Sequence, residues 1–257
     1  MITAGIDIGS LATKVVLLNE DKIISHEVIG TGVNVVEAAE KAMDKALEKA
    51  DISLEDVEAI VCTGAGKKKS PYASREATEV MCDARGVLHL YPEARGVIDI
   101  GGENCRAVKF DPEGNVIDFA LNDKCASGTG IFLDAMATAL RVKPEEMGEL
   151  SLQSTEDIEV TSMCSVFAES EVVSMVHRKM PKYDILKGIH KSIASRTYGL
   201  ANRILLEGEV VVVGGIAKNI GLTTILSELM ASELKIPEEP EIIGALGAAL
   251  LAREREV

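Results

Sequence analysis

The amino-acid sequence predicts an α/β protein built from two similar β-sheet lobes that face each other. The first observation is an internal repeat, in which an apolar strand that carries Asp7 is matched by a second strand that carries Asp99. The second is a valine-rich run at 209–213 followed by two glycines, the pattern of a buried strand whose carboxyl end meets a ligand. The third is the alternation of these strands with amphipathic helical patterns.

Each half of the repeat begins with a strand, a glycine-bearing hairpin and two further strands. The strand through Asp7 is followed by strands at 13–18 and 23–29. The strand through Asp99 is followed by strands predicted at 106–110 and 116–121. Aspartate, glycine and turn positions match over about 25 residues, which favours a duplication over two unrelated hairpins.

The remaining elements follow from hydrophobic periodicity and helix-start signals. A helix is predicted at 33–50, because its apolar residues share one face and its charges cover the other. Two further strands are predicted, at 59–62 and 157–160. The other predicted helices are a short one that begins at Pro144 and those at 131–140, 162–177, 183–207, 220–234 and 241–252. Small residues in the last helix permit the close approach of another helix. We place one lobe at 1–93 with 241–257 and the other at 94–240.

The composition favours a soluble, cytoplasmic protein that binds neither nucleic acid nor membranes. Acidic residues exceed basic ones by 41 − 27 = 14, whereas a nucleic-acid or anionic lipid surface calls for a basic face. We expect no membrane span, because no apolar run is long enough, and no signal segment, because no basic stretch is followed by an apolar run. The five cysteines are odd in number and scattered, which argues against a disulfide framework.

The two hairpins and the valine-rich strand have the residues of a nucleotide clamp. Backbone N–H groups converge at glycine turns and can cradle phosphate oxygens. Asp7 and Asp99 can hold Mg²⁺ through water or orient an attacking water. Gly214 and Gly215 leave room for a ribose or base against the backbone.

Residues 122–130 place a cysteine, a serine, a threonine and two glycines before a helix. Helix N-termini bind anions and lower the pKa of a thiol placed there. The plainer interpretation is a capped helix after a turn, with Cys125 as a small buried hydrophobe. Cys164 lies in the first turn of another predicted helix, so two cysteines share this setting. Cys62, Cys82 and Cys105 are interpreted as structural.

Over nearly its whole length the chain resembles the superfamily of acetate and sugar kinases, Hsp70 and actin. Residues 6–14 look like its first phosphate motif, 98–102 like its second, and 211–219 like its adenosine motif. Residues 128–140 and 241–252 look like its two connecting helices at the hinge between lobes. The resemblance implies a two-lobed, actin-like (ribonuclease H-like) ATPase fold, with the nucleotide in the central cleft.

Within that superfamily, residues 124–130 and 163–172 are most similar to the ATP-dependent activators of 2-hydroxyacyl-CoA dehydratases and related benzoyl-CoA reductase subunits. In that family, cysteines at these two places ligate a [4Fe–4S] cluster that two copies of the chain share. The resemblance therefore implies that Cys125 and Cys164 are cluster ligands. A cubane needs four thiolates, so a two-fold axis would supply the other two.

The same resemblance implies the function. We expect an ATPase with Mg²⁺ and ATP or ADP bound, which passes a low-potential electron from a dimer-bridging cluster to an acyl-CoA dehydratase or reductase. A homodimer, or a dimer with a close paralogue, and a donor such as ferredoxin or flavodoxin are implied. The implied catalytic residues are Asp7 and Asp99. The implied nucleotide-binding residues are Gly9, Ser10, Thr13, Lys14, Gly101, Gly102, Glu103, Gly128, Gly130, Gly214, Gly215, Ala217 and Asn219.

Two departures from the family pattern and two alternatives stay open. Glu103 stands where the family usually has glutamine, and residues 64–67 differ from the usual Gly-Tyr-Gly-Arg. The first alternative is a small-molecule kinase of the N-acetylglucosamine kinase type with structural cysteines, although no sugar-binding segment is found. The second is a nucleotide-gated scaffold that binds ATP without turnover.

Overall fold

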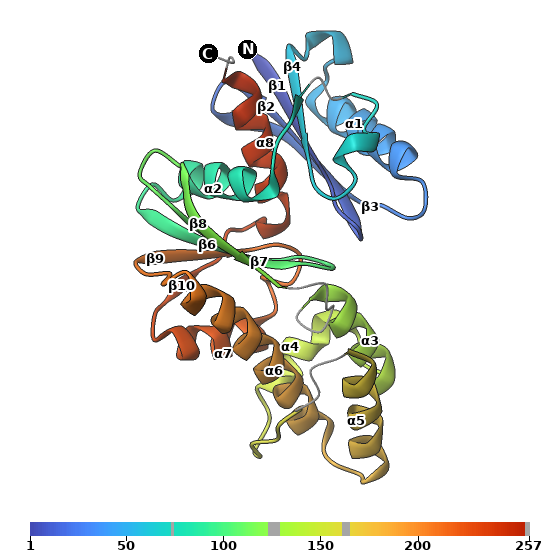
Figure 1. The fold of residues 1–257 in the computed structure, drawn as a ribbon. Coiled ribbons are helices and arrows are strands. Elements are labelled where there is room, and N and C mark those ends of the chain that lie inside the picture. Colours follow the sequence, from blue (N-terminus) through green and yellow to red (C-terminus); the bar gives the residue numbers. More distant parts are fainter. Residues whose placement is uncertain (73–74, 123–128, 161–164, 255–257) are drawn as a thin grey trace. The chain divides into compact units, whose positions relative to one another are not determined.

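The computed structural model describes residues 1–72, 75–122, 129–160 and 165–254 (Figure 1). The chain divides into two compact units. The first comprises Met1–Val97, Val108–Asp118 and Glu238–Val257, and the second comprises Ile98–Ala107 and Phe119–Pro237. No helix among the described residues is long and apolar enough to cross a membrane.

The first sheet has five strands in the order β3-β2-β1-β4-β5. They are β1 (Ile2–Ile8), β2 (Ala12–Asn19), β3 (Lys22–Gly30), β4 (Ala59–Thr63) and β5 (Arg75–Glu76). β1 runs antiparallel to β2 and parallel to β4, so Asp7 has Lys14 on one side and Thr63 on the other. The buried faces of these strands pack against α1 (Val35–Ala50), whose Asn34 side chain caps the first turn through the Glu37 amide.

Helices α2 (Glu79–Leu90) and α8 (Ile243–Arg253) pack against each other within the first unit. Glycines make this contact close. A methyl group added at Gly86 would overlap the Ile243 carbonyl, and one added at Gly247 would overlap the Cys82 carbonyl. The small residues of the last helix thus do meet another helix. That partner, α2, is not predicted from the sequence.

The second sheet repeats the first. Its order is β10-β9-β6-β7-β8; read from the other edge, β8-β7-β6-β9-β10, it is the order of the first sheet with each strand replaced by its repeat. The strands are β6 (Ala94–Ile100), β7 (Cys105–Phe110), β8 (Val116–Leu121), β9 (Glu209–Val213) and β10 (Leu234–Lys235). The duplication predicted for three strands therefore extends to all five.

The helices of the second unit build its apolar core around Phe132, Met136 and Ile189. They are α3 (Gly130–Leu140), α4 (Met147–Ser151), α5 (Ser165–His177), α6 (Lys182–Arg203) and α7 (Ile220–Met230). Single 3₁₀ turns occur at Leu54–Asp56, Lys67–Lys69, Pro144–Glu146 and Pro240–Ile242. α3 packs against α5, and α6 packs against both α4 and α7.

One predicted strand and two predicted helix ends are wrong. Residues 157–160 form no strand: the Asp184 carboxylate accepts hydrogen bonds from the amides of the preceding Thr155 and Glu156, and Ile158 packs on Gly188 of α6. α6 ends at Arg203 rather than 207, shortly before Leu205 takes a positive φ of 48°. α7 ends at Met230 rather than 234, because Ala231 takes the same left-handed conformation.

Candidate functional site

The first predicted phosphate hairpin centres on Asp7, at the end of β1. One carboxylate oxygen of Asp7 accepts a hydrogen bond from Lys14 Nζ at 2.9 Å, and both side chains are largely buried. The other oxygen faces Gly64, which follows β4 with a φ of 86°. A Cβ at Gly64 would lie 2.5 Å from both this oxygen and the Ile8 carbonyl. Only glycine fits there, so the Thr63–Gly64 turn helps to fix the carboxylate.

The second hairpin repeats this arrangement around Asp99, at the end of β6. Arg106 forms an ion pair with one carboxylate oxygen, and both side chains are at most 10% exposed. Gly214, with a φ of 92°, lies against the other oxygen and against the Ile100 carbonyl. Each unit thus holds an aspartate between a cation seven residues on and a left-handed glycine after a parallel strand.

The hairpin turns are closed by backbone hydrogen bonds. The Gly9 amide donates to Ala12 at 3.0 Å, and the Gly101 amide donates to Asn104 at 2.9 Å. The predicted phosphate-binding residue Thr13 is fully buried, and its hydroxyl donates to Thr31, which donates to the Gly9 carbonyl. Thr13 therefore buttresses the turn. Ser10 and Glu103 are exposed at the two turns.

The adenosine motif forms two consecutive turns between β9 and α7. The Ala217 amide donates to Gly214 at 3.2 Å, and the Asn219 amide donates to Ile216 at 2.9 Å. Asn219 then caps α7 through its side chain. No other residue of the described structure comes within 4 Å of the position of a Cβ on Gly215, so this exposed glycine presents open backbone. A flat nucleoside can rest on such a surface.

The start of α3 is tied to the second hairpin. The Gly130 amide donates to the Gly101 carbonyl and the Ile131 amide to the Gly102 carbonyl, each at 3.0 Å. On the other side of residues 123–128, the Asn122 amide donates to the Cys105 carbonyl at 3.0 Å, and the Cys105 amide donates to Asn122 Oδ1 at 2.8 Å. Two amides of the α3 N-terminus are thus bonded to protein carbonyls. The described residues on either side of 123–128 are therefore both hydrogen-bonded to strands or turns of the second hairpin.

Three predicted site residues, Gly128, Cys125 and Cys164, lie outside the described residues. Their described neighbours are informative, because Cys125 precedes α3 by a few residues and Cys164 immediately precedes α5. α3 and α5 pack together, and Phe132, Ala168 and Val172 share one core cluster. The two cysteines therefore precede the first turns of two helices in contact.

The other cysteines are enclosed. Cys62, Cys82 and Cys105 are buried, and no disulfide links them to one another. Burial raises the pKa of the Cys62 thiol to about 11 and that of the Cys105 thiol to about 12. Metal ligation requires a thiolate, so these values support the structural interpretation.

Three residues around these carboxylates were not predicted from the sequence as site residues: Gly64, Arg106 and Asp83. Gly64 and Arg106 are the counterparts of Gly214 and Lys14, and the repeat itself could have pointed to them. Asp83, on α2, is buried, and its carboxylate and that of Asp7 face Gly244 on α8, at 3.6 and 3.5 Å from a Cβ placed there. No sequence signal connects these two elements.

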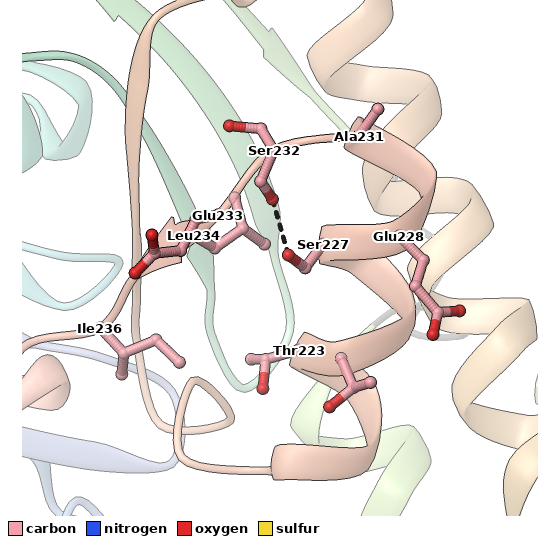
Figure 2. A pocket seen from close by; sticks show the side chains of 9 residues that line it. Thr223, Ser227, Glu228, Ala231, Ser232, Glu233, Leu234 and Ile236 are labelled. Atoms are coloured by element: carbon pink, nitrogen blue, oxygen red, sulfur yellow. Dashed lines mark hydrogen bonds between the residues drawn. The ribbon is translucent and has the colours of Figure 1, made fainter.

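A pocket of about 580 Å³ lies beside the C-terminal half of α7 and β10 (Figure 2). Its lining residues are Thr223, Thr224, Ser227, Glu228, Ala231, Ser232, Glu233, Leu234 and Ile236. No predicted site residue lines it. Its two charged side chains are carboxylates, which repel phosphate, so it is no candidate for the phosphates of a nucleotide.

Comparisons with known proteins agree with this geometry. Residues 4–252 match the model of the BadF/BadG/BcrA/BcrD ATPase family. The chain is 42% identical to the activator of lactoyl-CoA dehydratase from Anaerotignum propionicum, over 99% of this chain and 98% of that one. It is 35% identical to a subunit of benzoyl-CoA reductase from Thauera aromatica, over 97% and 92% of the two chains.

Solved structures of related proteins have the same fold as this chain. The activator of 2-hydroxyisocaproyl-CoA dehydratase from Clostridium difficile, with bound ADPNP, superposes with a TM-score of 0.92 at 40% identity, covering 98% of this chain and 94% of that one. A ROK family glucokinase from Streptomyces griseus, covering 98% and 99%, reaches a TM-score of 0.61 at 16% identity, which shows a shared fold alone. The predicted actin-like ATPase fold is confirmed.

Proposed function

Because the chain belongs to the BadF/BadG/BcrA/BcrD ATPase family, we propose that it is an ATP-hydrolysing activator of an acyl-CoA dehydratase or reductase. In this proposal it passes a low-potential electron to that partner from a [4Fe–4S] cluster shared by two copies of the chain. ATP and Mg²⁺ are the nucleotide and its metal, and a ferredoxin or flavodoxin is the donor.

The chain's own residues have the chemistry that a bound nucleotide requires. The amides of Ser10 and Gly102 are candidates for donating to phosphate oxygens. Asp7 and Asp99 are each held rigidly by a cation and a glycine, which suits a carboxylate that orients water. Lys14 and Arg106 balance these carboxylates in the absence of a metal, and Lys14 is the candidate to reach a phosphate. The open backbone at Gly215 is the surface on which we propose that the nucleoside packs.

The cysteines suit the cluster, judged by the described residues beside them. Four thiolates are needed, and one chain offers Cys125 and Cys164 before two packed helices. The three other cysteines are buried, two of them with a raised pKa. A second copy related by a two-fold axis would supply the remaining ligands. When bound, the cluster supplies one-electron redox chemistry.

The observation that carries the proposal is the pair of hydrogen bonds from Gly130 and Ile131 to Gly101 and Gly102. A turn that changes position when phosphate binds would pull on the start of α3, and therefore on the segment that contains Cys125. ATP can drive only a change between states that it binds differently, and this link gives the hairpin and the cysteine segment one shared motion.

Iron content tests the proposal. The protein is purified without oxygen, and iron is measured for the unaltered chain, for Cys125→Ser and for Cys105→Ser, a matched change at a buried thiol. We expect about four irons per two chains in the unaltered protein and in Cys105→Ser, and a loss of iron in Cys125→Ser. Iron-free unaltered protein that nevertheless binds and hydrolyses MgATP would refute the cluster but not the ATPase.

The kinase alternative is not supported by a specific observation. Its fold relatives are 16% identical, whereas dehydratase activators are about 40% identical over nearly the full length. The scaffold alternative is decided by turnover: phosphate release from MgATP, reduced strongly in Asp99→Asn, would exclude it.

A further inference from the structure

A buried hydrogen-bond chain connects α4, α6 and the start of α7. His190, on α6, is fully buried. Its Nδ1 lies 2.9 Å from Ser151 Oγ at the end of α4, and its Nε2 lies 3.2 Å from Asn219 Nδ2. Ser151 Oγ in turn lies 2.7 Å from the Gly148 carbonyl. None of these groups takes part in the nucleotide or cluster chemistry proposed above, apart from Asn219 at the end of the adenosine motif.

The partners determine every proton in this chain. The Gly148 carbonyl can only accept, so Ser151 gives its one proton there and must accept from His190 Nδ1. His190 Nε2 is then a lone pair, which matches the Asn219 amide nitrogen. The Asn219 amide cannot be flipped, because its oxygen accepts from the Leu222 amide at 3.1 Å to cap α7. The chain therefore requires neutral His190 in the Nδ1–H tautomer.

Close backbone packing encloses this chain of hydrogen bonds. A Cβ at Gly221 would lie 2.8 Å from His190 Nδ1 and from the Gly148 carbonyl, and it would overlap Ser151 Oγ. A Cβ at Gly148 would lie 2.9 Å from Asn219 Oδ1. No side chain fits between α4 and α7 at this point. The burial of the imidazole also lowers the pKa of His190 to about 4, so the neutral form persists at physiological pH.

We propose that His190 is a positioning residue for the nucleotide: through Asn219 it fixes the start of α7 and the turns that run back to Gly214. The turns between Gly214 and Asn219 are closed by their own hydrogen bonds, so an anchor at Asn219 sets the whole loop. Gly214 at the other end lies against the Asp99 carboxylate. The inference rests on the proposed nucleotide site and adds a residue that does not touch the ligand.

Two substitutions at one position separate the two hydrogen bonds. In His190→Gln, the amide oxygen can take the place of Nε2 and accept from Asn219, while the bond to Ser151 is lost. In His190→Asn, the shorter amide can keep a donor toward Ser151 but cannot reach Asn219. His177→Asn, at an exposed position of α5, controls for the chemical change. The measurement is MgADP affinity by calorimetry on the full chain, with thermal unfolding beside it.

We expect His190→Asn to weaken MgADP binding about tenfold or more, and His190→Gln to stay within about threefold of the unaltered protein. Equal losses in both variants, or none in His190→Asn, would overturn the inference. Should a variant not fold, ¹⁵N NMR of the histidines in the unaltered protein still decides: an Nε2–H tautomer of His190 contradicts the proposal, and Nδ1–H with a shift on adding MgADP supports it. Unaltered protein that does not bind MgADP would instead refute the proposed function.

Discussion

Two adjacent glycines, Gly214 and Gly215, are expected to respond in opposite ways to the same substitution. Gly214 has a φ of 92°, and a Cβ there would overlap the Asp99 carboxylate and lie 2.6 Å from the Ile100 carbonyl. Left-handed backbone costs an alanine about 1–2 kcal/mol, and overpacking costs about 1–3 kcal/mol. Gly214→Ala should therefore lose about 3 kcal/mol of folding free energy. In a chain of this size that lowers the melting temperature by about 6–12 °C.

Gly215→Ala is the matched control, because Gly215 has no positive φ and, its two chain neighbours aside, no described residue lies within 4 Å of its Cβ position. Its melting temperature should stay unchanged or rise slightly, since alanine restricts the unfolded chain. Its new methyl group would occupy the surface on which we propose that the nucleoside packs, so MgADP affinity should fall about tenfold. Thermal unfolding and calorimetry measure the two effects. Equal melting temperatures for both variants, or unaltered MgADP affinity in Gly215→Ala, would refute the reasoning.

Three further predictions concern packing, charge and pH. Gly247→Ala should destabilise the protein by about 3 kcal/mol, because its Cβ would overlap the Cys82 carbonyl where α2 and α8 meet. Gly199→Ala, on the open side of α6, should be neutral or stabilising. Denaturant unfolding of the two variants compares these effects. Arg106→Ala should cost about 3 kcal/mol of folding free energy, because it leaves the Asp99 charge buried and unpaired. Lys41→Ala removes the exposed Lys41–Glu37 pair and should leave the unfolding free energy nearly unchanged. Equal costs would contradict the burial argument. Burial lowers the pKa of His190 from 6.5 to about 4, so the unfolded chain takes up this proton first as pH falls. The contribution of neutral His190 to the unfolding free energy is therefore full above pH 6.5, and about 3 kcal/mol of it is lost by pH 4. Measuring the unfolding free energy against pH should show that His190→Gln lacks this loss.

The duplicated strands were predictable because the sheet period and the Asp-Gly turns are local signals. The same repeat could have identified the ion pairs, since Asp7 and Lys14 are cross-strand partners seven residues apart, as are Asp99 and Arg106 by analogy. It could also have related Gly64 to Gly214. Gly64 was not recognised as the counterpart of Gly214, because the strand before Gly64 is not the valine-rich run that precedes Gly214.

Helix α2 could not be predicted from periodicity, because a charged residue and a glycine interrupt its apolar buried face. That face includes Asp83 and Gly86, which break the stripe that a helix prediction needs. Its partner α8 requires a glycine there, which is a tertiary constraint. Similarly, the alternation at 157–160 is satisfied by contact with Gly188 of α6 rather than by a neighbouring strand. The hinge role of 128–140 and 241–252 stays a prediction.

We infer that nucleotide binding at the second hairpin is coupled to the cysteine segment through the start of α3. Gly130→Pro removes the amide that donates to Gly101, and proline is well tolerated at the first position of a helix. The most direct measurement is the EPR spectrum of the reduced protein with and without MgATP, for the unaltered chain and for this variant. We expect a spectrum that changes with MgATP in the unaltered chain and changes much less in Gly130→Pro at equal iron content. A cluster signal unaffected by MgATP in the unaltered protein would contradict it.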